Sequence, residues 1–189
     1  MRIKVVVNFA TSNKFKVNEA NEIGKRFNIK FIQIKCKYPE IRSENVEDVA
    51  LEGAKFVYSK VKKPVIVEDT GLYIETLNGF PGSYSKFVYQ KIGNNGILKL
   101  LENKKNRNAT FISAIGYCNG KFTKIFSGKI NGKISTKILG KEGFGYDPIF
   151  IPDGYKKTFA QDYELKKKIS HRKKAFEKFC EWINKKKIR

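Results

Sequence analysis

The sequence predicts an α/β fold built on a mixed β-sheet, and two observations lead to that class. As far as residue 67, short apolar strands alternate with amphipathic helices, as they do in parallel α/β sheets. Beyond residue 107, two β-rich segments are joined by Asn119-Gly120, a dipeptide typical of tight hairpins. We therefore expect one continuous fold of 189 residues in which the α/β part and an antiparallel meander form two lobes.

Three strands and two helices are predicted in the first part of the chain. The strands cover Ile3 to Val7, Ile29 to Ile34 and Val65 to Val67, and each is a short apolar or alternating run. The helices cover Lys14 to Phe27 and Val46 to Lys62, where apolar residues recur at helical spacing.

Two short helices, three strands and a long final helix are predicted in the second part. They cover Tyr84–Ile92, Gly96–Glu102, Asn108–Asn119, Lys121–Ser135, Tyr146–Ile151 and the segment that starts at Ser170. The final helix ends in a basic tail, Lys185 to Arg189. No internal repeat or low-complexity linker interrupts the order, so we expect residues 1–189 to form a single domain.

The chain is strongly basic, with 39 Lys and Arg residues against 18 Asp and Glu residues and a net charge of +21. Such a charge attracts polyanions, among them nucleoside triphosphates and nucleic acids. The lysines are spread along the whole chain, however, as they are when they only solvate the surface, and we take solvation as the cause of most of the charge.

Cysteine usage and hydropathy indicate a soluble intracellular protein. The three cysteines, Cys36, Cys118 and Cys180, form no CxxC pair, which argues against a thiolate zinc site and favours reduced thiols. No apolar run approaches the roughly 18 residues that cross a bilayer, and the apolar core of the N-terminus is too short for a signal peptide. We expect a cytoplasmic location and no membrane partner.

The connection between the first strand and the first helix is a candidate phosphate site. Backbone N–H groups and the positive end of the helix dipole would point to one place there. Thr11 and Asn13 add side-chain donors, and Lys14 and Lys16 add positive charge. The segment contains no glycine-rich phosphate motif, and taken alone it is more typical of an ordinary connection with Ser12 or Asn13 as helix cap.

Glu68 and Asp69 are the most informative carboxylates in this basic chain. They follow the strand that is predicted to end at Val67, and open α/β sheets bind ligands at the carboxyl ends of strands. Adjacent residues on a strand point to opposite sides, so one acid could hold a divalent cation while the other orients water. Glu40, in a loop after the second strand, could reach the same edge. The alternative is a common acidic turn, Asp69-Thr70-Gly71.

A glycine-spaced aromatic loop, Lys141 to Pro148, enters the predicted strand at Tyr146–Ile151. The glycines allow close backbone approach, so Phe144 could stack on a planar base while the backbone hydrogen-bonds the edge of that base. Core aromatic residues in an ordinary turn would give the same pattern. Lys86, which follows the turn at Pro81-Gly82, could reach an anion or simply face water.

His171 is the only histidine of the chain, and with Arg172 it follows Ser170, a good N-cap for the last helix. A solvated helix start is the commoner reason for such a pair. A single histidine excludes a metal site made of several histidines. Any metal should therefore be a hard cation held by carboxylates, most naturally Mg²⁺.

In this order and spacing, the motifs together resemble the inosine triphosphate pyrophosphatase family, the non-standard purine nucleoside triphosphate pyrophosphatases. The matching stretches run from residue 11 to residue 175. They are Thr11-Ser12-Asn13-Lys14-Phe15-Lys16, Glu40 after Tyr38-Pro39, Glu68-Asp69-Thr70-Gly71-Leu72, Pro81-Gly82, Phe144-Gly145-Tyr146-Asp147-Pro148, Thr158-Phe159-Ala160, and Ile169-Ser170-His171-Arg172 followed by Ala175.

The resemblance implies an elongated mixed β-sheet flanked by helices, with two lobes and a central cleft, usually in a homodimer. It implies Mg²⁺-dependent hydrolysis of ITP, dITP and XTP to the monophosphate and pyrophosphate, which cleanses the nucleotide pool. Glu40 and Glu68 would hold Mg²⁺, and Asp69 would act as general base. The residues expected to bind substrate are Thr11, Ser12, Asn13, Lys14, Phe15, Lys16, Glu68, Asp69, Lys86, Phe144, Gly145, Tyr146, Asp147, Lys166, His171 and Arg172.

The chain departs from the family pattern in three places. Ser12 stands where the family often has glycine, and Ser85-Lys86-Phe87 stands where it often has Ser-Ala-Arg. Lys167 follows Lys166, where asparagine is usual. None of these changes removes a charge that hydrolysis needs.

Two other functions are compatible with the sequence. The net charge and basic tail would suit a nucleic-acid-binding module, and the nucleotide motifs would also suit a sensor that binds without turnover. Readers of single strands expose aromatic residues between basic ones, whereas most aromatic residues here have core-like spacing. We therefore expect purine nucleoside triphosphates as partners and no specific nucleic-acid partner.

Overall fold

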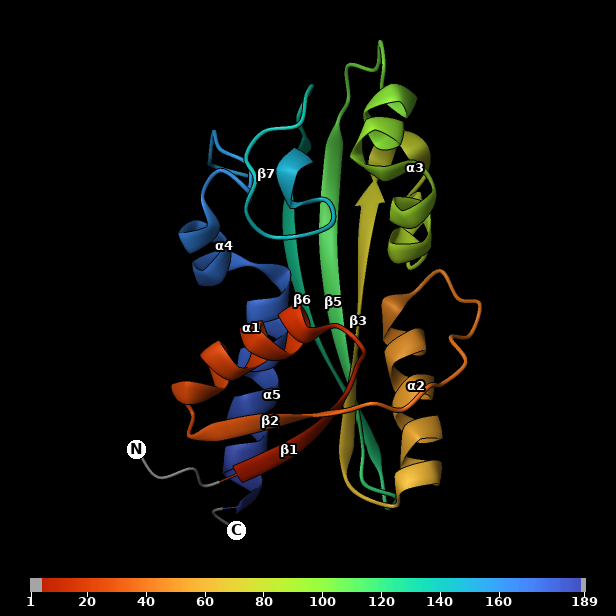
Figure 1. The fold of residues 1–189 in the computed structure, drawn as a ribbon, viewed down its shortest axis with the longest axis vertical. Coiled ribbons are helices and arrows are strands. Elements are labelled where there is room, and N and C mark those ends of the chain that lie inside the picture. The colour runs from red at the N-terminus through yellow and green to blue at the C-terminus, as the bar shows by residue number, and fades with distance from the viewer. Residues whose placement is uncertain (1–4, 188–189) are drawn as a thin grey trace. The chain divides into compact units, whose positions relative to one another are not determined.

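A seven-stranded mixed sheet flanked by helices forms the framework of the chain, which confirms the predicted α/β class (Figure 1). The computed structural model describes residues 5–187. The strands are β1 (Val5–Ala10), β2 (Ile29–Ile34), β3 (Val65–Ile74), β4 (Pro81–Gly82), β5 (Asn108–Cys118), β6 (Thr123–Ile134) and β7 (Phe150–Pro152). The helices are α1 (Lys14–Lys25), α2 (Val46–Val61), α3 (Ser85–Leu100), α4 (Tyr163–Ile169) and α5 (His171–Lys187), with short 3₁₀ turns at Glu75–Leu77 and Asp147–Ile149.

The chain divides into two compact units, which we call unit 1 and unit 2. Unit 1 comprises residues 1–69, 113–128 and 172–189, and unit 2 comprises residues 70–112 and 129–171. The strand order is β2-β1-β3-β5-β6-β7, with β4 paired to β3, and three of these strands contribute residues to both units. The expectation of a single domain over residues 1–189 stays a prediction.

Parallel pairing in unit 1 sets the level at which its strands end. β1 pairs in parallel with β2 on one side and with β3 on the other. Ala10, the last residue of β1, is in register with Ile34 at the end of β2 and with Val67 within β3. The loop that follows β1 therefore starts beside Glu68 and Asp69, and the loop that follows β2 starts at the same level, one strand further along the sheet.

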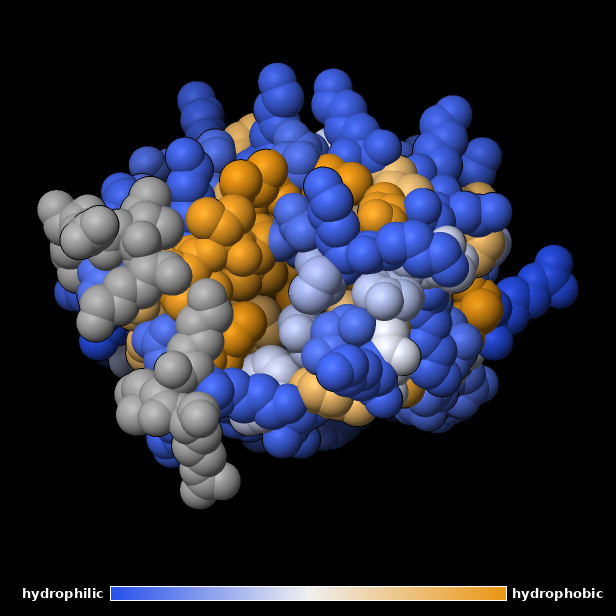
Figure 2. Space-filling model, turned by 90° about the horizontal axis from the view of Figure 1, so that it is seen from below, coloured by the Kyte–Doolittle hydropathy of each residue, from blue (hydrophilic) through white to orange (hydrophobic). Residues whose placement is uncertain are grey.

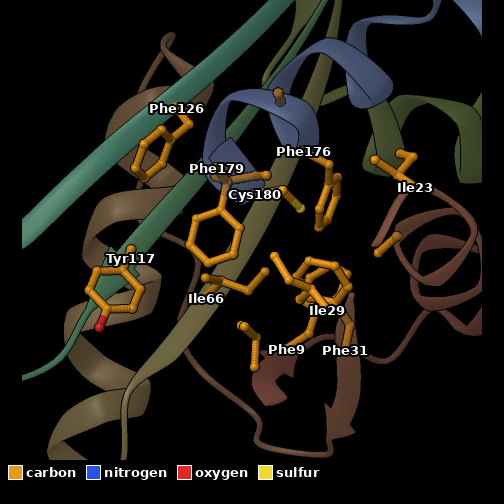
Figure 3. Packing of buried hydrophobic residues seen from close by; sticks show 14 of the residues in the cluster. Phe9, Ile23, Ile29, Phe31, Ile66, Tyr117, Phe126, Phe176, Phe179 and Cys180 are labelled. Carbon is orange, nitrogen blue, oxygen red and sulfur yellow. The ribbon is translucent and has the colours of Figure 1, made fainter. Parts of the chain in front are cut away.

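Side chains alternate between the two faces of β3 in unit 1, and different helices cover the two faces. Ile66 belongs to the main aromatic core beneath α1 and α5, whereas Val65 and Val67 pack in a separate cluster with residues of α2. Figure 3 shows the aromatic core around Ile66, with side chains of Phe9, Phe31, Tyr117, Phe126, Phe176 and Phe179. Two helical layers thus fix the position of the central strand.

Unit 2 is built around the antiparallel part of the sheet. β4 pairs with β3 through Leu72 and Gly82, and β7 pairs with β6 through Ile134 and Phe150. The predicted hairpin is confirmed, since β5 and β6 flank the turn at residues 119–122. Helix α3 is broken at Gly93, where φ is 59° and ψ is −162°, so the two short helices predicted there are also confirmed.

Three predicted strands differ from the observed ones, and one helix was missed. β1 continues to Ala10 instead of ending at Val7. β3 does not end at Val67 but continues to Ile74, because fully buried Leu72 and Ile74 pack in the core of unit 2 and Leu72 pairs with β4. The predicted strand at Tyr146–Ile151 begins only at Phe150. Pro148 has no N–H to give to a ladder, and it lies within the 3₁₀ turn at Asp147–Ile149. The short helix α4 was not predicted.

The surface and the cysteines agree with the composition. Figure 2 shows hydrophilic side chains over most of the face it presents, with a smaller area of hydrophobic side chains among them. Among residues 5–187, no helix has the length and apolar character needed to cross a membrane. The three cysteines carry free thiols. The predicted strand residues Ile3 and Lys4 and the last two residues of the basic tail lie outside the described residues.

Candidate active site

The loop between β1 and α1 is shaped by its own polar side chains. Asn13 caps α1, because its Oδ1 accepts a hydrogen bond from the Phe15 N–H at 2.9 Å. The N–H of Asn13 donates to Thr11 Oγ1 at 3.1 Å, and Gln33 of β2 donates to the Thr11 carbonyl at 2.8 Å. Ser12, Lys14 and Phe15 are exposed. The capping interpretation is confirmed for Asn13, and the same geometry presents the positive end of α1 to solvent.

Four charged side chains of unit 1 alternate in sign around β3. Lys16 Nζ lies 2.7 Å from Glu68 Oε2 and donates to the Glu68 carbonyl at 3.0 Å. Arg172 Nε lies 3.2 Å from Glu68 Oε1, and its Nη1 lies 2.7 Å from Glu19 Oε2. The hydroxyl of Ser113 donates to Glu68 Oε1. Glu68 is therefore contacted on both carboxylate oxygens.

The charge on Glu68 is retained despite complete burial of its side chain. Burial by itself raises the pKa of this carboxyl, but Arg172 and Lys16 outweigh that effect and hold the pKa well below its usual range. Glu68 is thus an anion at neutral pH. A buried charge of this kind is tolerated because it is paired and hydrogen-bonded.

Tyr38 carries the loop that contains Glu40 to the side of β3. Its ring packs against Gly53 of α2, where an added Cβ would lie 2.9 Å from the ring and 3.1 Å from Val67. A residue with a side chain at position 53 would therefore displace the ring. This contact explains how a loop with no regular structure, residues 35–45, reaches the acids of β3.

Three carboxylates act on the hydroxyl of Tyr38. Burial raises the pKa of this phenol above its usual range, and the charges of Asp69, Glu40 and Glu68 raise it further. Glu40 is exposed, Asp69 is partly exposed and Glu68 is buried. The different burial of Glu68 and Asp69 agrees with the expectation that neighbours on a strand point to opposite sides.

The chemistry of these acids is suited to a hard cation. Among the described residues, no three or more His, Cys, Asp or Glu side chains lie together as a ready metal cage. Mg²⁺ does not require one, because it is usually bound by one or two carboxylates together with substrate phosphates and water. Glu40 and Glu68 provide such oxygens near one hydroxyl, and a cation there would share Glu68 with Lys16 and Arg172.

In unit 2, the carboxylate of Asp147 organises the aromatic loop. Its Oδ2 accepts hydrogen bonds from the Phe144 N–H and from Lys166 Nζ, each at 2.8 Å. Lys166 Nζ also lies 4.4 Å from the centre of the Phe144 ring. Gly143 has a φ of 77°, and a Cβ there would collide with the same carboxylate oxygen. The loop is thus wrapped around a buried ion pair.

The remaining predicted residues of unit 2 have distinct surroundings. Tyr146 is buried, and Gly145 has a positive φ of 62°. His171 is 2% exposed, and its ring stacks on Phe111 with 4.5 Å between centroids and 14° between planes. Lys86 is exposed on the first turn of α3.

The solvated helix start considered for His171 and Arg172 is excluded, since both side chains are 2% exposed. α4 ends at Ile169, directly before α5, so this helix begins at a buried position. The guanidinium of Arg172, expected at the substrate, is bound by Glu68 and Glu19.

The structure gathers the predicted residues into two groups. The group in unit 1 holds Thr11, Ser12, Asn13, Lys14, Phe15, Lys16, Glu40, Glu68, Asp69 and Arg172. The group in unit 2 holds Phe144, Gly145, Tyr146, Asp147 and Lys166, with His171 and Lys86 elsewhere in that unit.

Some residues of the site were missed by sequence reasoning. Glu19 stands three positions after Lys16 on α1, so helical spacing could have placed both on one face. Ser113 and Gly53 gave no comparable signal, because their importance comes only from what packs against them.

Comparisons with known proteins agree with the fold and the motifs. The Ham1 family matches residues 7–182. The dITP/XTP pyrophosphatase of Methanopyrus kandleri is 52% identical over 176 residues, which cover 92% of this chain and 94% of that relative. The dITP/XTP pyrophosphatase of Pyrococcus horikoshii is 51% identical over 178 residues, with 93% and 95% covered. The solved Ham1 protein of Staphylococcus aureus gives a TM-score of 0.83 at 30% identity and covers 97% of this chain and 100% of its own.

Proposed function

Because the chain belongs to the Ham1 family, we propose that it hydrolyses the non-standard purine nucleotides ITP, dITP and XTP to the monophosphate and pyrophosphate. The curated relatives that support this substrate class are named dITP/XTP pyrophosphatases. The observation that carries the proposal is the ionised Glu68, held by Lys16 and Arg172 next to Asp69 and level with the end of β1. Positive charge that can bind phosphates thus lies next to Asp69, a carboxylate that can accept a proton.

In the proposed reaction, Asp69 accepts a proton from a water whose oxygen attacks the α-phosphorus. The bond from the α-phosphorus to the bridging oxygen breaks, and pyrophosphate leaves with the electron pair. Lys14, Lys16 and the N-terminus of α1 neutralise the charge that develops on the leaving group, which is the usual main contribution to catalysis of such transfers. Mg²⁺ held by Glu40 and Glu68 would supply further charge neutralisation at the phosphates.

The aromatic loop of unit 2 is the proposed base site. Inosine and xanthine carry a 6-oxo acceptor where adenine carries an amino donor, so a site that offers only donors leaves adenine with an unpaired group. The Phe144 N–H is already used by Asp147, and Arg172 by Glu68 and Glu19. We therefore assign donation to His171 and to the backbone of Gly145 and Tyr146, with Phe144 stacking on the base.

Three broader properties are also proposed. The chain would act as one domain. It would form a homodimer and work on the nucleotide pool of the cytoplasm. The names of the relatives support the part of this proposal that concerns nucleotides.

The general-base assignment is tested by Asp69→Asn. The kcat for ITP with Mg²⁺ should fall about 10²–10⁴-fold, the range for loss of a general base, while KM changes little. Asp153→Asn is the matched control, because Asp153 is an exposed acid in unit 2 and should leave both constants unchanged. Turnover at the wild-type rate in Asp69→Asn would remove the assignment.

Two measurements separate the enzyme from its alternatives. Release of pyrophosphate from ITP distinguishes hydrolysis from a sensor, which would bind ITP and release nothing. A nucleic-acid-binding module would instead bind DNA with a steep dependence on salt concentration.

A further inference from the structure

Helix α3 contacts the aromatic loop at three points. The hydroxyl of Tyr146 donates to the Ser85 carbonyl at 3.0 Å. The rings of Tyr89 and Tyr146 meet edge to face, with 5.3 Å between centroids and 84° between planes. The side-chain amide of Asn94 donates from Nδ2 to the Gly145 carbonyl at 3.1 Å. All of these residues belong to unit 2.

A continuous helix could not make all three contacts on one side. Ser85 makes its contact through the main-chain carbonyl, so the side-chain directions to compare are those of Tyr89 and Asn94. At 3.6 residues per turn, Asn94 would lie about 140° around the axis from Tyr89 and would face away from the loop. The backbone break at Gly93 changes the direction of the chain immediately before Asn94. The break therefore places Asn94 on the same loop as Ser85 and Tyr89.

The conformation of Gly93 is one that residues with a Cβ rarely adopt. Its φ of 59° combined with a ψ of −162° is open essentially to glycine alone. A Cβ at this position would meet no atom within 4 Å. Substitution at position 93 would thus disturb only the backbone, without a steric clash.

Asn94 is not placed where stability alone would favour it. Its Oδ1 is buried and has no hydrogen-bond partner among the described residues, and burying an unpaired acceptor is unfavourable. The side chain gains one hydrogen bond, which its amide donates to the Gly145 carbonyl. Gly143 and Gly145 flank Phe144, and glycine has the greatest backbone freedom, so this loop needs anchors on both sides.

We propose that Asn94, set by the break at Gly93, is a positioning residue for recognition of the purine. Asp147 fixes the loop through the Phe144 N–H, and Asn94 fixes it through the Gly145 carbonyl. Together they hold the ring of Phe144 and the N–H groups after it in one orientation. The inference rests on the proposed function, because it takes this loop as the base site.

The test compares Asn94→Asp with Asn95→Asp. The first variant keeps the shape of the side chain and removes the donor, whereas Asn95 is the exposed neighbour of the same type. The KM for ITP should rise about fivefold in Asn94→Asp, as expected for the loss of one hydrogen bond, with kcat within about twofold of wild type. Gly93→Ala should shift KM in the same direction. Asn95→Asp should change neither constant.

A second readout does not depend on activity. Hydrogen exchange of the amides at residues 143–146, measured without nucleotide, should be faster in Asn94→Asp and Gly93→Ala than in Asn95→Asp. Inhibition by tripolyphosphate should stay unchanged, because that ligand has no base; a merely structural defect would weaken it too. Unchanged exchange, or faster exchange with an unchanged KM, would overturn the inference. If wild-type protein releases no pyrophosphate from ITP, the proposed function fails, and the exchange experiment still tests the anchor.

Discussion

Unit 1 and unit 2 each contain a buried carboxylate paired with a basic side chain, but the two carboxylates orient different parts of the chain. Glu68 in unit 1 contacts the side chains of Lys16, Arg172 and Ser113. Asp147 in unit 2 contacts Lys166 and the backbone N–H of Phe144. Glu68 therefore orients side chains, whereas Asp147 orients the main chain.

The difference follows from the element that carries each acid. Glu68 lies within β3, whose backbone is already fixed by its neighbours in the sheet, so its carboxylate is available to hold charged side chains. Asp147 follows a loop with glycines at 143 and 145, and there the backbone itself has to be fixed. We propose that the ion pairs of Glu68 serve the triphosphate and that the ion pair of Asp147 serves the base.

The largest effect that tests this comparison is expected for Glu68→Gln. This change leaves Arg172 and Lys16 without their shared anion, and the free energy of unfolding should fall by about 3–5 kcal/mol. Asp147→Asn should cost less, because Asp147 pairs with one cationic side chain, Lys166, whereas Glu68 pairs with two. Urea unfolding at pH 7 measures both changes. An equal or larger loss in Asp147→Asn would show that the two pairs are not distinguished by the number of cations they hold.

A smaller effect is expected on the affinity for two fragments of the substrate, tripolyphosphate and inosine, which test the two units separately. Lys16→Met should weaken binding of tripolyphosphate about tenfold, or about 1.4 kcal/mol, and leave inosine unaffected. Lys166→Met should do the reverse, because it removes the cation beside Phe144 and releases Asp147. Titration calorimetry with the two fragments measures each affinity.

The control for these lysine variants is Lys25→Met, an exposed lysine in the last turn of α1. It lowers the net charge by the same amount as the other two changes and should alter neither affinity by more than about twofold. Loss of tripolyphosphate binding in Lys25→Met would mean that overall charge, rather than the position of Lys16, attracts the phosphates.

The smallest effect is expected at two exposed ion pairs of matched geometry, one in each unit. Glu52 and Lys55 in α2 lie 2.6 Å apart, as do Glu164 and Lys167 in α4, and all four side chains are at least 45% exposed. Glu52→Gln and Glu164→Gln should each change the free energy of unfolding by less than about 0.5 kcal/mol. A loss comparable to that of Glu68→Gln would contradict the argument that burial decides the strength of these pairs.

Features with a local cause were predicted well. Asn13 caps α1 because its side chain bonds to the N–H two residues later, and the Asn119-Gly120 turn joins β5 and β6. The interruption of α3 was also visible, since Gly93 and Gly96 weaken a helix. α4 escaped prediction because seven residues with three consecutive lysines show little apolar spacing.

Features that depend on distant partners were not predicted. β3 was expected to end before Glu68, but its pairing with β4 and the burial of Leu72 and Ile74 in unit 2 carry it on to Ile74. The bond between Arg172 and Glu19 joins residues 153 positions apart, and no pattern in the sequence announces it. The sequence therefore predicted candidate polar residues but not what they contact.

By itself, the sequence determined the fold class and the family resemblance, because helix caps, tight turns and apolar periodicity act over a few neighbouring positions. Only the tertiary structure decided that Tyr38 rests on Gly53, that Arg172 neutralises Glu68 and that Asn94 reaches Gly145. Those contacts arise when separate elements pack together, and a side chain's partner across such a contact is fixed by the shape of the whole core rather than by its neighbours in the chain.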